Sequence, residues 1–346
     1  MQYELRTQVI EPLRPTFQHL VDRLGDRPAS RYEEGTIGLQ ATEHFHYRPL
    51  WDPDHELYDP DHSALKLTDP YSFTDPRQYY YAPYVTTRAL MFEAFARTLD
   101  YIDDHDLFAA MAPAWRKLTT AALLPMRHYE GAAQLVSVAG ARFAYGTSVE
   151  QCLSYAAFDR IGNAQTLSRI GLAMGTGATG TAGIGAELEE ARRRWLEDAA
   201  LQPLRRYAEE ALAEPDWAVA TYAIDLTDRL LYPLLYRHLD RAALAAGQTA
   251  LSLSTQHLHA WYTDQRRWLD ALLRAWTADP GHGPANAEAL AAATRAWLPR
   301  AEQAVAALAE AADAIVPTGA HHAAGELAVH ARQDLAAAGI DAGESA

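Results

Sequence analysis

Cysteine is almost missing from this sequence, whose 346 residues include only Cys152. A single cysteine cannot form an internal disulfide or build a thiolate metal site, so we expect Cys152 to act as a small buried hydrophobic residue. Long apolar runs are missing too. Charges interrupt every apolar stretch well before the roughly 20 residues of a transmembrane helix. The first residues also lack the basic-then-apolar layout of a signal peptide.

Positive charge is in short supply. The chain has 45 acidic and 30 basic side chains, which gives a net charge of −15. This balance argues against a nucleic-acid-binding protein and against docking on an anionic membrane, since both need a basic surface. Together with an ordinary content of apolar residues, it leads us to expect a soluble cytoplasmic protein. Length alone suggests two domains, at about 150 residues per domain.

Residues 26–83 show no helical or strand periodicity and are rich in proline, aspartate and aromatic residues. Asp-Pro occurs in them four times, and each proline removes an amide donor and biases the preceding residue away from helix. Disordered segments are poor in aromatic residues, whereas this one is rich in them. We therefore expect residues 1–83, the N-terminal arm, to be ordered and extended on a surface, either its own or a partner's.

Helical periodicity takes over after the arm and continues almost to the end of the chain. Met91, Phe95 and Leu99, for example, recur at the spacing of one helix face. No strand-rich region is recognisable, so the expected class is all-α, with residues 84–346 forming a single long-helix bundle. The glycine-rich run 174–186 is expected to be a flexible connection, and the last residues to be frayed. The expected helices cover about 84–103, 113–144, 147–173, 186–213, 217–246, 249–278 and 285–313.

Common catalytic motifs are absent from the sequence. Gly175, Gly177 and Gly180 fit G-x-G-x-x-G superficially, but no strand precedes them, so we expect no dinucleotide site. No G-x-S-x-G occurs, and no sheet is expected to carry a nucleophile elbow. The Ala-rich helix near 285–313 is expected to pack on the bundle, with a coiled coil to a partner as the alternative.

An all-α chain with many carboxylates and 14 histidines suggests a carboxylate-bridged di-iron centre. Such a centre needs Glu-x-x-His on two helices, because residues i and i+3 project from one helix face. Glu-x-x-His occurs once, at Glu43–His46 in the arm, and each Asp-x-x-His has a proline directly after its aspartate. The sequence therefore predicts no di-iron centre in this chain.

Several histidines of the arm alternate with carboxylates, and such side chains can ligate zinc. Zinc sites usually have tighter Cys/His spacing and a closed set of ligands. Satisfied surface or interface histidines are therefore the preferred interpretation, and zinc ligation is the alternative. The residues concerned are His44, His46, His55 and His62.

Residues 31–53, 66–85 and 157–172 resemble the β subunit of bacterial multicomponent phenol hydroxylase, a soluble di-iron monooxygenase; TDPRQYYY, at 74–81, is the most specific part. The resemblance covers most of the chain. It implies a ferritin-like fold, and it implies that only the sister α subunit keeps the iron-binding motifs. This chain would then hold no metal and no catalytic residue. The implied degenerate ligand positions are Pro125, His128, Gln265 and Trp268.

The resemblance also implies an α2β2γ2 hydroxylase. Its α subunit uses di-iron to hydroxylate aromatic rings with O2, a reductase with FAD and an iron–sulfur cluster delivers electrons from NADH, and a small regulatory protein tunes the site. The arm is expected to contact the α subunit, because aromatic residues and arginine are enriched at interface centres. The alternative is that its rings pack only on this chain's own bundle. The expected contact residues are Tyr47, Trp51, Arg77, Tyr79, Tyr80 and Tyr81.

Two other functions stay open at this point. One is a stand-alone ferritin-like oxidase with an atypical metal site. The other is a helical scaffold unrelated to oxygenases. The atypical site would use His128, Glu130, Asp228 and Asp264.

Overall fold

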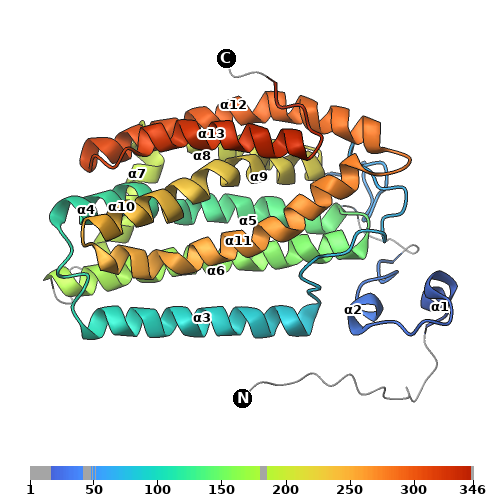
Figure 1. Ribbon diagram of the computed structural model, residues 1–346, viewed down its shortest axis with the longest axis horizontal. Coiled ribbons are helices and arrows are strands. Elements are labelled where there is room, and N and C mark those ends of the chain that lie inside the picture. Colours follow the sequence, from blue (N-terminus) through green and yellow to red (C-terminus); the bar gives the residue numbers. More distant parts are fainter. Residues whose placement is uncertain (1–16, 42–47, 49, 51, 180–184, 344–346) are drawn as a thin grey trace.

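The computed structural model describes residues 17–41, 48, 50, 52–179 and 185–343, and these form helices, turns and loops without a β-strand. The expected all-α helical bundle is confirmed. Figure 1 shows long helices lying side by side, with α3 along one edge beside α6, and α12 and α13 on the opposite side. No described helix has an apolar stretch that would span a lipid bilayer.

Two short helices belong to the arm, and the others build the bundle. Two π-helical segments, labelled η, continue α4 and α9 respectively. The arm helices are α1 (Gln18–Leu24) and α2 (Arg31–Glu34). The bundle elements are α3 (Tyr81–Asp104), α4 (Pro113–Leu118), η1 (Thr119–Leu123), α5 (Met126–Phe143), α6 (Thr147–Thr179), α7 (Ala186–Glu197), α8 (Gln202–Ala213), α9 (Trp217–Pro233), η3 (Leu234–His238), α10 (Leu239–Ala245), α11 (Thr249–Thr277), α12 (Gly283–Ile315) and α13 (Ala320–Ala337).

Helix α9 lies at the centre of the bundle. It is buried along nearly its whole length and contacts α5, α8, α11, α12 and α13. The Asp216 carboxylate caps its start by accepting the amide of Ala218 at 2.9 Å. A helix that is mostly apolar on all sides is stable only when neighbours cover every face. The few polar side chains of α9 are therefore held mostly in the interior, and one of them, Asp228, belongs to the candidate site below.

The expected helix 186–213 is wrong as a single element, because the chain turns between α7 and α8. Asp198 closes the turn by accepting the amide of Ala200 at 3.1 Å, and the Gln202 amide group donates to the Asp198 carbonyl. Pro203 stands in the first turn of α8, where its missing N–H costs nothing. Pro203 thus marks the start of a second helix. The periodicity of the charged residues alone had predicted one helix over 186–213.

Two expectations about helix ends are also wrong. The run 174–186 is not a connection throughout, since α6 continues to Thr179; residues 180–184 lie outside the described residues. The C-terminal residues are not frayed over 320–337, where α13 packs on α12. The Asp313 carboxylate caps α13 by accepting the amides of Ala320 and His321. The buried face of α13 is largely alanine, so it gives little hydropathy contrast.

The other expected helices are present, but some of their details differ from the expectation. Regions 113–144 and 217–246 each run as one helical path, but with a π-helical turn inside. In the first, the amide of Leu124 bonds the carbonyl of Thr119, which widens the helix just before Pro125. Gly247, expected to end the second, does follow its last helix and has a φ of 74°. The Ala-rich α12 packs on α8, α9 and α13 of its own bundle.

The described part of the N-terminal arm lies on the chain's own bundle. The backbone of Lys66 exchanges two hydrogen bonds with the Asn286 side chain, at 2.9 and 2.7 Å. Gln40 spans the turn between α5 and α6, donating to the Ala144 carbonyl and accepting the amide of Gly146. The arm is not wholly extended, because α1 and α2 form in it, and a Ser30–Glu33 capping box starts α2.

The packing of the arm against the bundle can be tested at Gly146. Its φ is 109°, and an added Cβ would lie 2.3 Å from the Pro70 carbonyl oxygen in the arm. We expect Gly146→Ala to lower the free energy of unfolding by about 2–4 kcal/mol in urea titrations. The control is Gly325→Ala, in exposed helix α13 with no heavy atom near the new Cβ. It should be neutral or stabilise by about 0.5–1 kcal/mol. Equal stability of both variants would show that the arm does not pack there.

Candidate functional site: a charged cluster inside the bundle

Three charged side chains meet in the middle of the bundle, one from each of three helices. Arg160 of α6 donates to Glu130 of α5 at 3.1 Å and forms an ion pair with Asp228 of α9. All three side chains are at most 2% exposed. Charged groups almost never lie so deep unless they are paired. We call these three residues the central cluster.

Two tyrosines add a hydrogen bond to each carboxylate of the central cluster. The Tyr129 hydroxyl donates to Asp228 at 2.8 Å, and the Tyr232 hydroxyl donates to Glu130. Burial raises the pKa of both tyrosines well above the ordinary value, so they stay protonated donors. Burial also raises the pKa of Glu130 and Asp228, although the Arg160 guanidinium acts in the opposite direction. Each carboxylate is hydrogen-bonded to Arg160 and to a tyrosine, and the guanidinium keeps its proton.

Helix α11 closes the fourth side of the cluster with aromatic rings. Trp261 lies 4.8 Å from the Arg160 guanidinium, measured to the ring centroid. The indole N–H of Trp268 donates to the Gln265 amide oxygen at 2.8 Å, and both side chains are buried. Gln265 and Trp268 line the same small internal void as Arg160 and Asp228. The structure thus brings the two predicted degenerate positions of α11 to the central cluster.

The other two predicted degenerate positions lie elsewhere. Pro125 is the N-cap residue of α5. His128 is half-buried, with its ring 6.0 Å from that of Trp195 in α7 and its Nε2 3.3 Å from Arg127. Burial, with help from Arg127, lowers the pKa of His128 to about 4. The side chain that α5 turns into the cluster is Glu130, and the matching of Pro125 and His128 to degenerate ligand positions stays a prediction.

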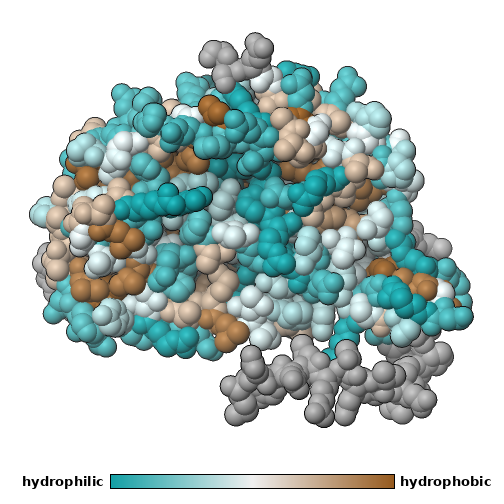
Figure 2. All heavy atoms as spheres, viewed as in Figure 1, coloured by the Kyte–Doolittle hydropathy of each residue, from teal (hydrophilic) through white to brown (hydrophobic). Residues whose placement is uncertain are grey.

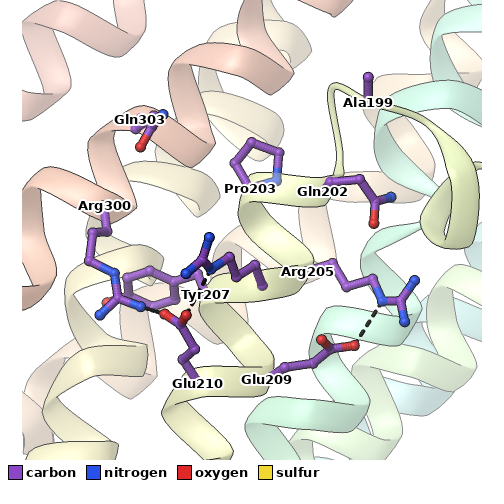
Figure 3. A pocket seen from close by; sticks show the side chains of 10 residues that line it. Ala199, Gln202, Pro203, Arg205, Tyr207, Glu209, Glu210, Arg300 and Gln303 are labelled. Carbon is purple, nitrogen blue, oxygen red and sulfur yellow. Dashed lines mark hydrogen bonds and ion pairs between the residues drawn. The ribbon is translucent and has the colours of Figure 1, made fainter.

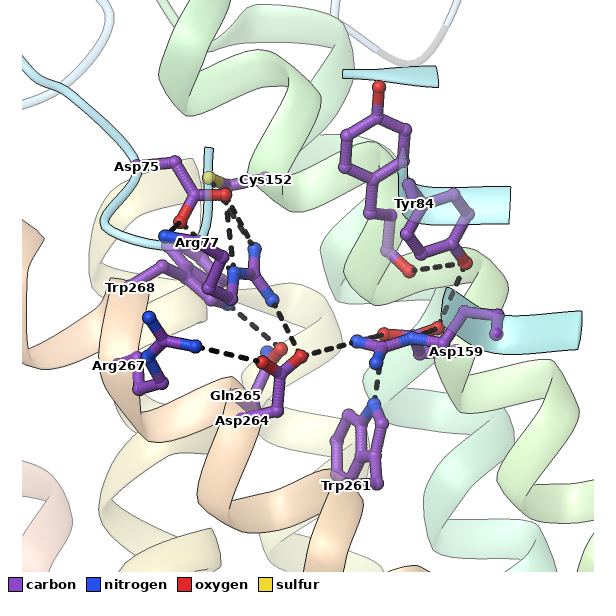
Figure 4. A network of polar contacts seen from close by, with 12 residues as sticks. Asp75, Arg77, Tyr84, Cys152, Asp159, Trp261, Asp264, Gln265, Arg267 and Trp268 are labelled. Atoms are coloured by element: carbon purple, nitrogen blue, oxygen red, sulfur yellow. Dashed lines mark hydrogen bonds and ion pairs between the residues drawn. The ribbon is translucent and has the colours of Figure 1, made fainter. Parts of the chain in front are cut away.

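A second polar network connects the arm to the bundle (Figure 4). Arg77 pairs with Asp75 at 3.0 Å and contacts Asp264 of α11 at 3.5 Å. Asp264 also pairs with Arg88 of α3 at 2.7 Å, and Arg88 pairs with Asp159 of α6 at 2.7 Å. A continuous chain of alternating charges therefore runs from the arm across three helices. We call it the arm network.

The arm network bears on the expected contact residues. Arg77 and Tyr79 are each 8% exposed, because Arg77 lies inside the network and its guanidinium stacks on the Tyr79 ring at 4.7 Å. Their burial leaves little side-chain surface for a partner, so the expectation fits them poorly. Tyr80 is half-buried, and Tyr81 is 73% exposed. The remaining two expected contacts, Tyr47 and Trp51, lie outside the described residues.

Cys152 is buried as expected, but it has a charged neighbour that the sequence did not reveal. An Arg77 amino group lies 3.7 Å from its sulfur. Burial nevertheless raises the pKa of the thiol well above its ordinary value. A protonated, inaccessible thiol is a poor nucleophile. Cys152 is therefore part of the packing.

A broad surface hollow of about 800 Å³ lies between α8 and α12 (Figure 3). Its arginines already have partners, because Arg205 pairs with Glu209 and Arg206 with Glu210, each at 2.8 Å. Arg300 also pairs with Glu210. The charges of this hollow are thus largely compensated within the chain, and it contains no cluster of catalytic groups.

The sequence profile of the methane/phenol/alkene hydroxylase family matches residues 51–280. The chain belongs to this family. Among its relatives, the phenol 2-monooxygenase oxygenase component DmpL of Pseudomonas sp. (strain CF600) is 38% identical over 91% of this chain and 93% of DmpL. The corresponding component MhpL of Acinetobacter pittii (strain PHEA-2) is 34% identical over 82% of this chain and 83% of its own length. The resemblance found from the sequence is thereby confirmed.

Solved structures of the family show the same architecture. A chain of the xenon-pressurized phenol hydroxylase from Pseudomonas sp. OX1 is 32% identical and superposes with a TM-score of 0.86, covering 98% of this chain and 99% of its own. A chain of toluene 4-monooxygenase is 20% identical, with a TM-score of 0.75, over 88% of this chain and 100% of its own. Because the toluene 4-monooxygenase chain is only 20% identical, its similarity concerns the fold alone. Both agree with the helical bundle described above.

The interior residues do not fit the di-iron group of this family. Glu130 and Asp228 offer carboxylates, but the Arg160 guanidinium lies between them and bonds to both. A fixed cation would repel iron, and Gln265 provides a neutral amide already bonded to Trp268. The four residues of the alternative oxidase site are not gathered either. His128 contacts Trp195, and Asp264 belongs to the arm network, so only Glu130 and Asp228 meet.

Arg160 is the residue that sequence reasoning missed. It lies in the segment 157–172 that carries the family resemblance, but neither spacing nor a motif singled it out. The available signal was an Asp159–Arg160 pair between the apolar residues Phe158 and Ile161, since charges on a buried face must find partners. The partners, Glu130 and Asp228, are 30 and 68 residues away along the chain. No local pattern connects them.

The central cluster can be tested by its charge balance. We expect Arg160→Met to lower the free energy of unfolding by about 3–5 kcal/mol in urea titrations, because two buried carboxylates lose their counter-charge. Replacing all three residues by apolar ones (Glu130→Leu, Arg160→Met, Asp228→Leu) should regain most of that loss. The control Arg193→Met, an exposed arginine of α7, should stay within about 0.5 kcal/mol of the parent. A loss no larger for Arg160→Met than for Arg193→Met would contradict the cluster.

Proposed function

We propose that this chain is the non-catalytic β subunit of a phenol- or toluene-type multicomponent aromatic monooxygenase. It would be the structural subunit of the hydroxylase component in the breakdown of aromatic hydrocarbons. Support comes from the relatives, which are oxygenase components of phenol 2-monooxygenases and align over most of their length. The activity would belong to the assembled complex, in the cytoplasm.

The observation that carries the proposal is the guanidinium in the bundle interior. In a metal-binding bundle, inward carboxylates and histidines must be free to bind the ion. Here the two inward carboxylates hold Arg160, and each also accepts a hydrogen bond from a tyrosine hydroxyl. A cluster so arranged stabilises the fold and offers neither an open coordination position nor a base. We infer that the chain holds no iron and carries no catalytic residue.

The complex would provide what this chain lacks. The α subunit would hold the di-iron centre that activates O2, and α, β and γ would form an α2β2γ2 hydroxylase. NADH, FAD and an iron–sulfur cluster would belong to the reductase, and a regulatory protein would complete the system. Nucleic acid and membrane are not expected partners.

An exposed apolar surface indicates where the α subunit would bind. Phe158 and Ile161 of α6 are 58% and 46% exposed, and Val85 and Phe92 of α3 are each about 40% exposed. The two helices are adjacent, and the Phe92 ring fills the space above Gly162. Figure 2 shows a hydrophobic spot over the middle of α3. We call Tyr81, Val85, Phe92, Phe158 and Ile161 the α3–α6 face.

This face has the composition of an interface centre. Large aromatic side chains there are costly to leave in water, and they contribute most of the binding free energy when a partner covers them. It includes Tyr81, at the end of the arm, which is the most exposed of the expected contact residues that the structure describes. The arm would thus contribute to the interface mainly through its end, while Arg77 and Tyr79 hold that end in place.

Metal analysis tests the absence of iron. The full chain, produced alone in iron-supplemented cells, should contain far less than one iron atom per chain and show no O2-dependent hydroxylation. Co-produced α subunit should contain the iron of the assembled complex. About two iron atoms per chain together with turnover by this chain alone would establish the oxidase instead.

The α3–α6 face can be tested by introducing charge. We expect Phe158→Asp with Ile161→Asp to weaken binding of the α subunit at least about tenfold, because carboxylates would be buried without partners. Binding would be measured by calorimetry and by size-exclusion chromatography of the mixed subunits. The control is Val329→Asp, equally exposed but on α13, on the opposite side of the bundle (Figure 1). Unchanged binding of the double variant would place the interface elsewhere.

A further inference from the structure

Three metal-capable side chains meet in the proline-rich loop between α2 and α3. Asp52, His55 and His62 each offer a ligand atom, and these atoms lie within 4.8 Å of one another. Within residues 17–41, 48, 50, 52–179 and 185–343, no other group of three such side chains is so close. The group is remote from the central cluster in sequence and in contacts. We call it the loop triad.

The bundle holds one member of the loop triad firmly. The His62 side chain is 3% exposed and packs edge-on against the Phe143 ring at the end of α5, with centroids 4.5 Å apart. Its Nε2 lies 3.0 Å from the Pro215 carbonyl oxygen, and the Ala64 amide donates to Asp216 at 2.7 Å. The loop is thereby fixed to the junction of α8 and α9. A rigid attachment of this kind pre-organises a ligand.

The hydrogen bonding of His62 leaves one nitrogen with a free lone pair. A carbonyl oxygen can only accept, so Nε2 donates to Pro215, and Nδ1 is the unprotonated nitrogen of the neutral ring. Nδ1 is buried and has no hydrogen-bond partner. Buried polar atoms nearly always have a partner, so this one points to a ligand. Neutral imidazole is the form that binds transition metals.

The other two members are already arranged as in many metal sites. The Asp52 carboxylate oxygens lie 2.8 and 3.0 Å from Nδ1 of His55 and accept a hydrogen bond from it. A carboxylate bonded to one imidazole nitrogen leaves the other for a metal and increases its basicity. The His55 ring stacks on that of His62, with centroids 3.9 Å apart and planes 5° from parallel. Nε2 of His62 lies 3.8 Å from the Asp52 carboxylate, so two imidazole rings and a carboxylate lie together.

A cavity beside the loop triad leaves room for an ion and its water ligands. It has a volume of about 360 Å³, and the triad shares its lining with apolar side chains, among them Leu135, Phe143 and Trp217. Apolar walls strengthen the attraction between a cation and Asp52. The chain's net charge of −15 also favours cation entry.

We propose that the loop triad binds one divalent transition-metal ion, with Zn²⁺ as the occupant. Imidazole and carboxylate ligands suit Zn²⁺, which takes four ligands at about 2.0–2.2 Å, so small side-chain rotations and one or two waters complete the set. The ion links the proline-rich loop to the bundle through His62. Its role is structural, and it is independent of the proposed β-subunit function.

The full chain, stripped with a chelator, would be titrated with Zn²⁺ by calorimetry and with Co²⁺ by visible absorption. One equivalent should bind, with the absorption bands of low-symmetry Co²⁺. His55→Gln and His62→Gln should each lower the affinity at least about 100-fold. The control is His322→Gln, an exposed histidine of α13 with Glu326 3.5 Å away but no third ligand. It should bind as the parent does.

Two results would overturn the site. One is the absence of stoichiometric binding to the parent chain. The other is binding that neither histidine variant weakens. Should His62→Gln fail to fold, His55→Gln and Asp52→Asn decide the matter, because both side chains lie nearer the surface, at 35% and 19% exposure. Assembly with the α subunit, measured separately, distinguishes failure of this site from failure of the proposed function.

Discussion

The architecture depends on how one buried cation is neutralised. Arg160 is almost fully removed from water, and removing a guanidinium from water costs several kcal/mol unless its hydrogen bonds and charge are met. Glu130 and Asp228 neutralise its charge and accept from its two terminal amino groups, and they stand on two other helices. Helices α5, α6 and α9 therefore have one mutual arrangement in which no charge is orphaned. Apolar packing alone would allow these three helices several mutual arrangements.

The arm network applies the same constraint at the edge of the bundle. Asp264 accepts from arginines of the arm and of α3, so those two parts meet α11 through one carboxylate. Trp261 then connects the two networks, because its indole N–H donates to Asp159 and its ring lies over Arg160. The interior charge and the docking of the arm are consequently parts of one continuous polar structure.

Under the proposed function, this arrangement would explain how the family fold persists in a subunit without iron. Carboxylates inside a helical bundle need a partner of opposite charge, and iron is one such partner. A guanidinium is another, and in the proposed β subunit it would take the place of the metal charge with a group that the chain itself supplies. The bundle then keeps its shape and its outer faces for a partner, which is what the proposed β-subunit role requires.

The sequence alone determined the all-α class, most helix positions, the absence of helical Glu-x-x-His motifs and the family, because these rest on local periodicity and short motifs. It did not reveal α13, whose buried face is alanine, or the break before Pro203. The central cluster was decided only by tertiary structure, since Glu130, Arg160 and Asp228 are far apart in sequence and meet only when three helices pack. Arg77 is a further example of what tertiary structure decided. Local composition assigned it to an interface, whereas packing buries it within this chain.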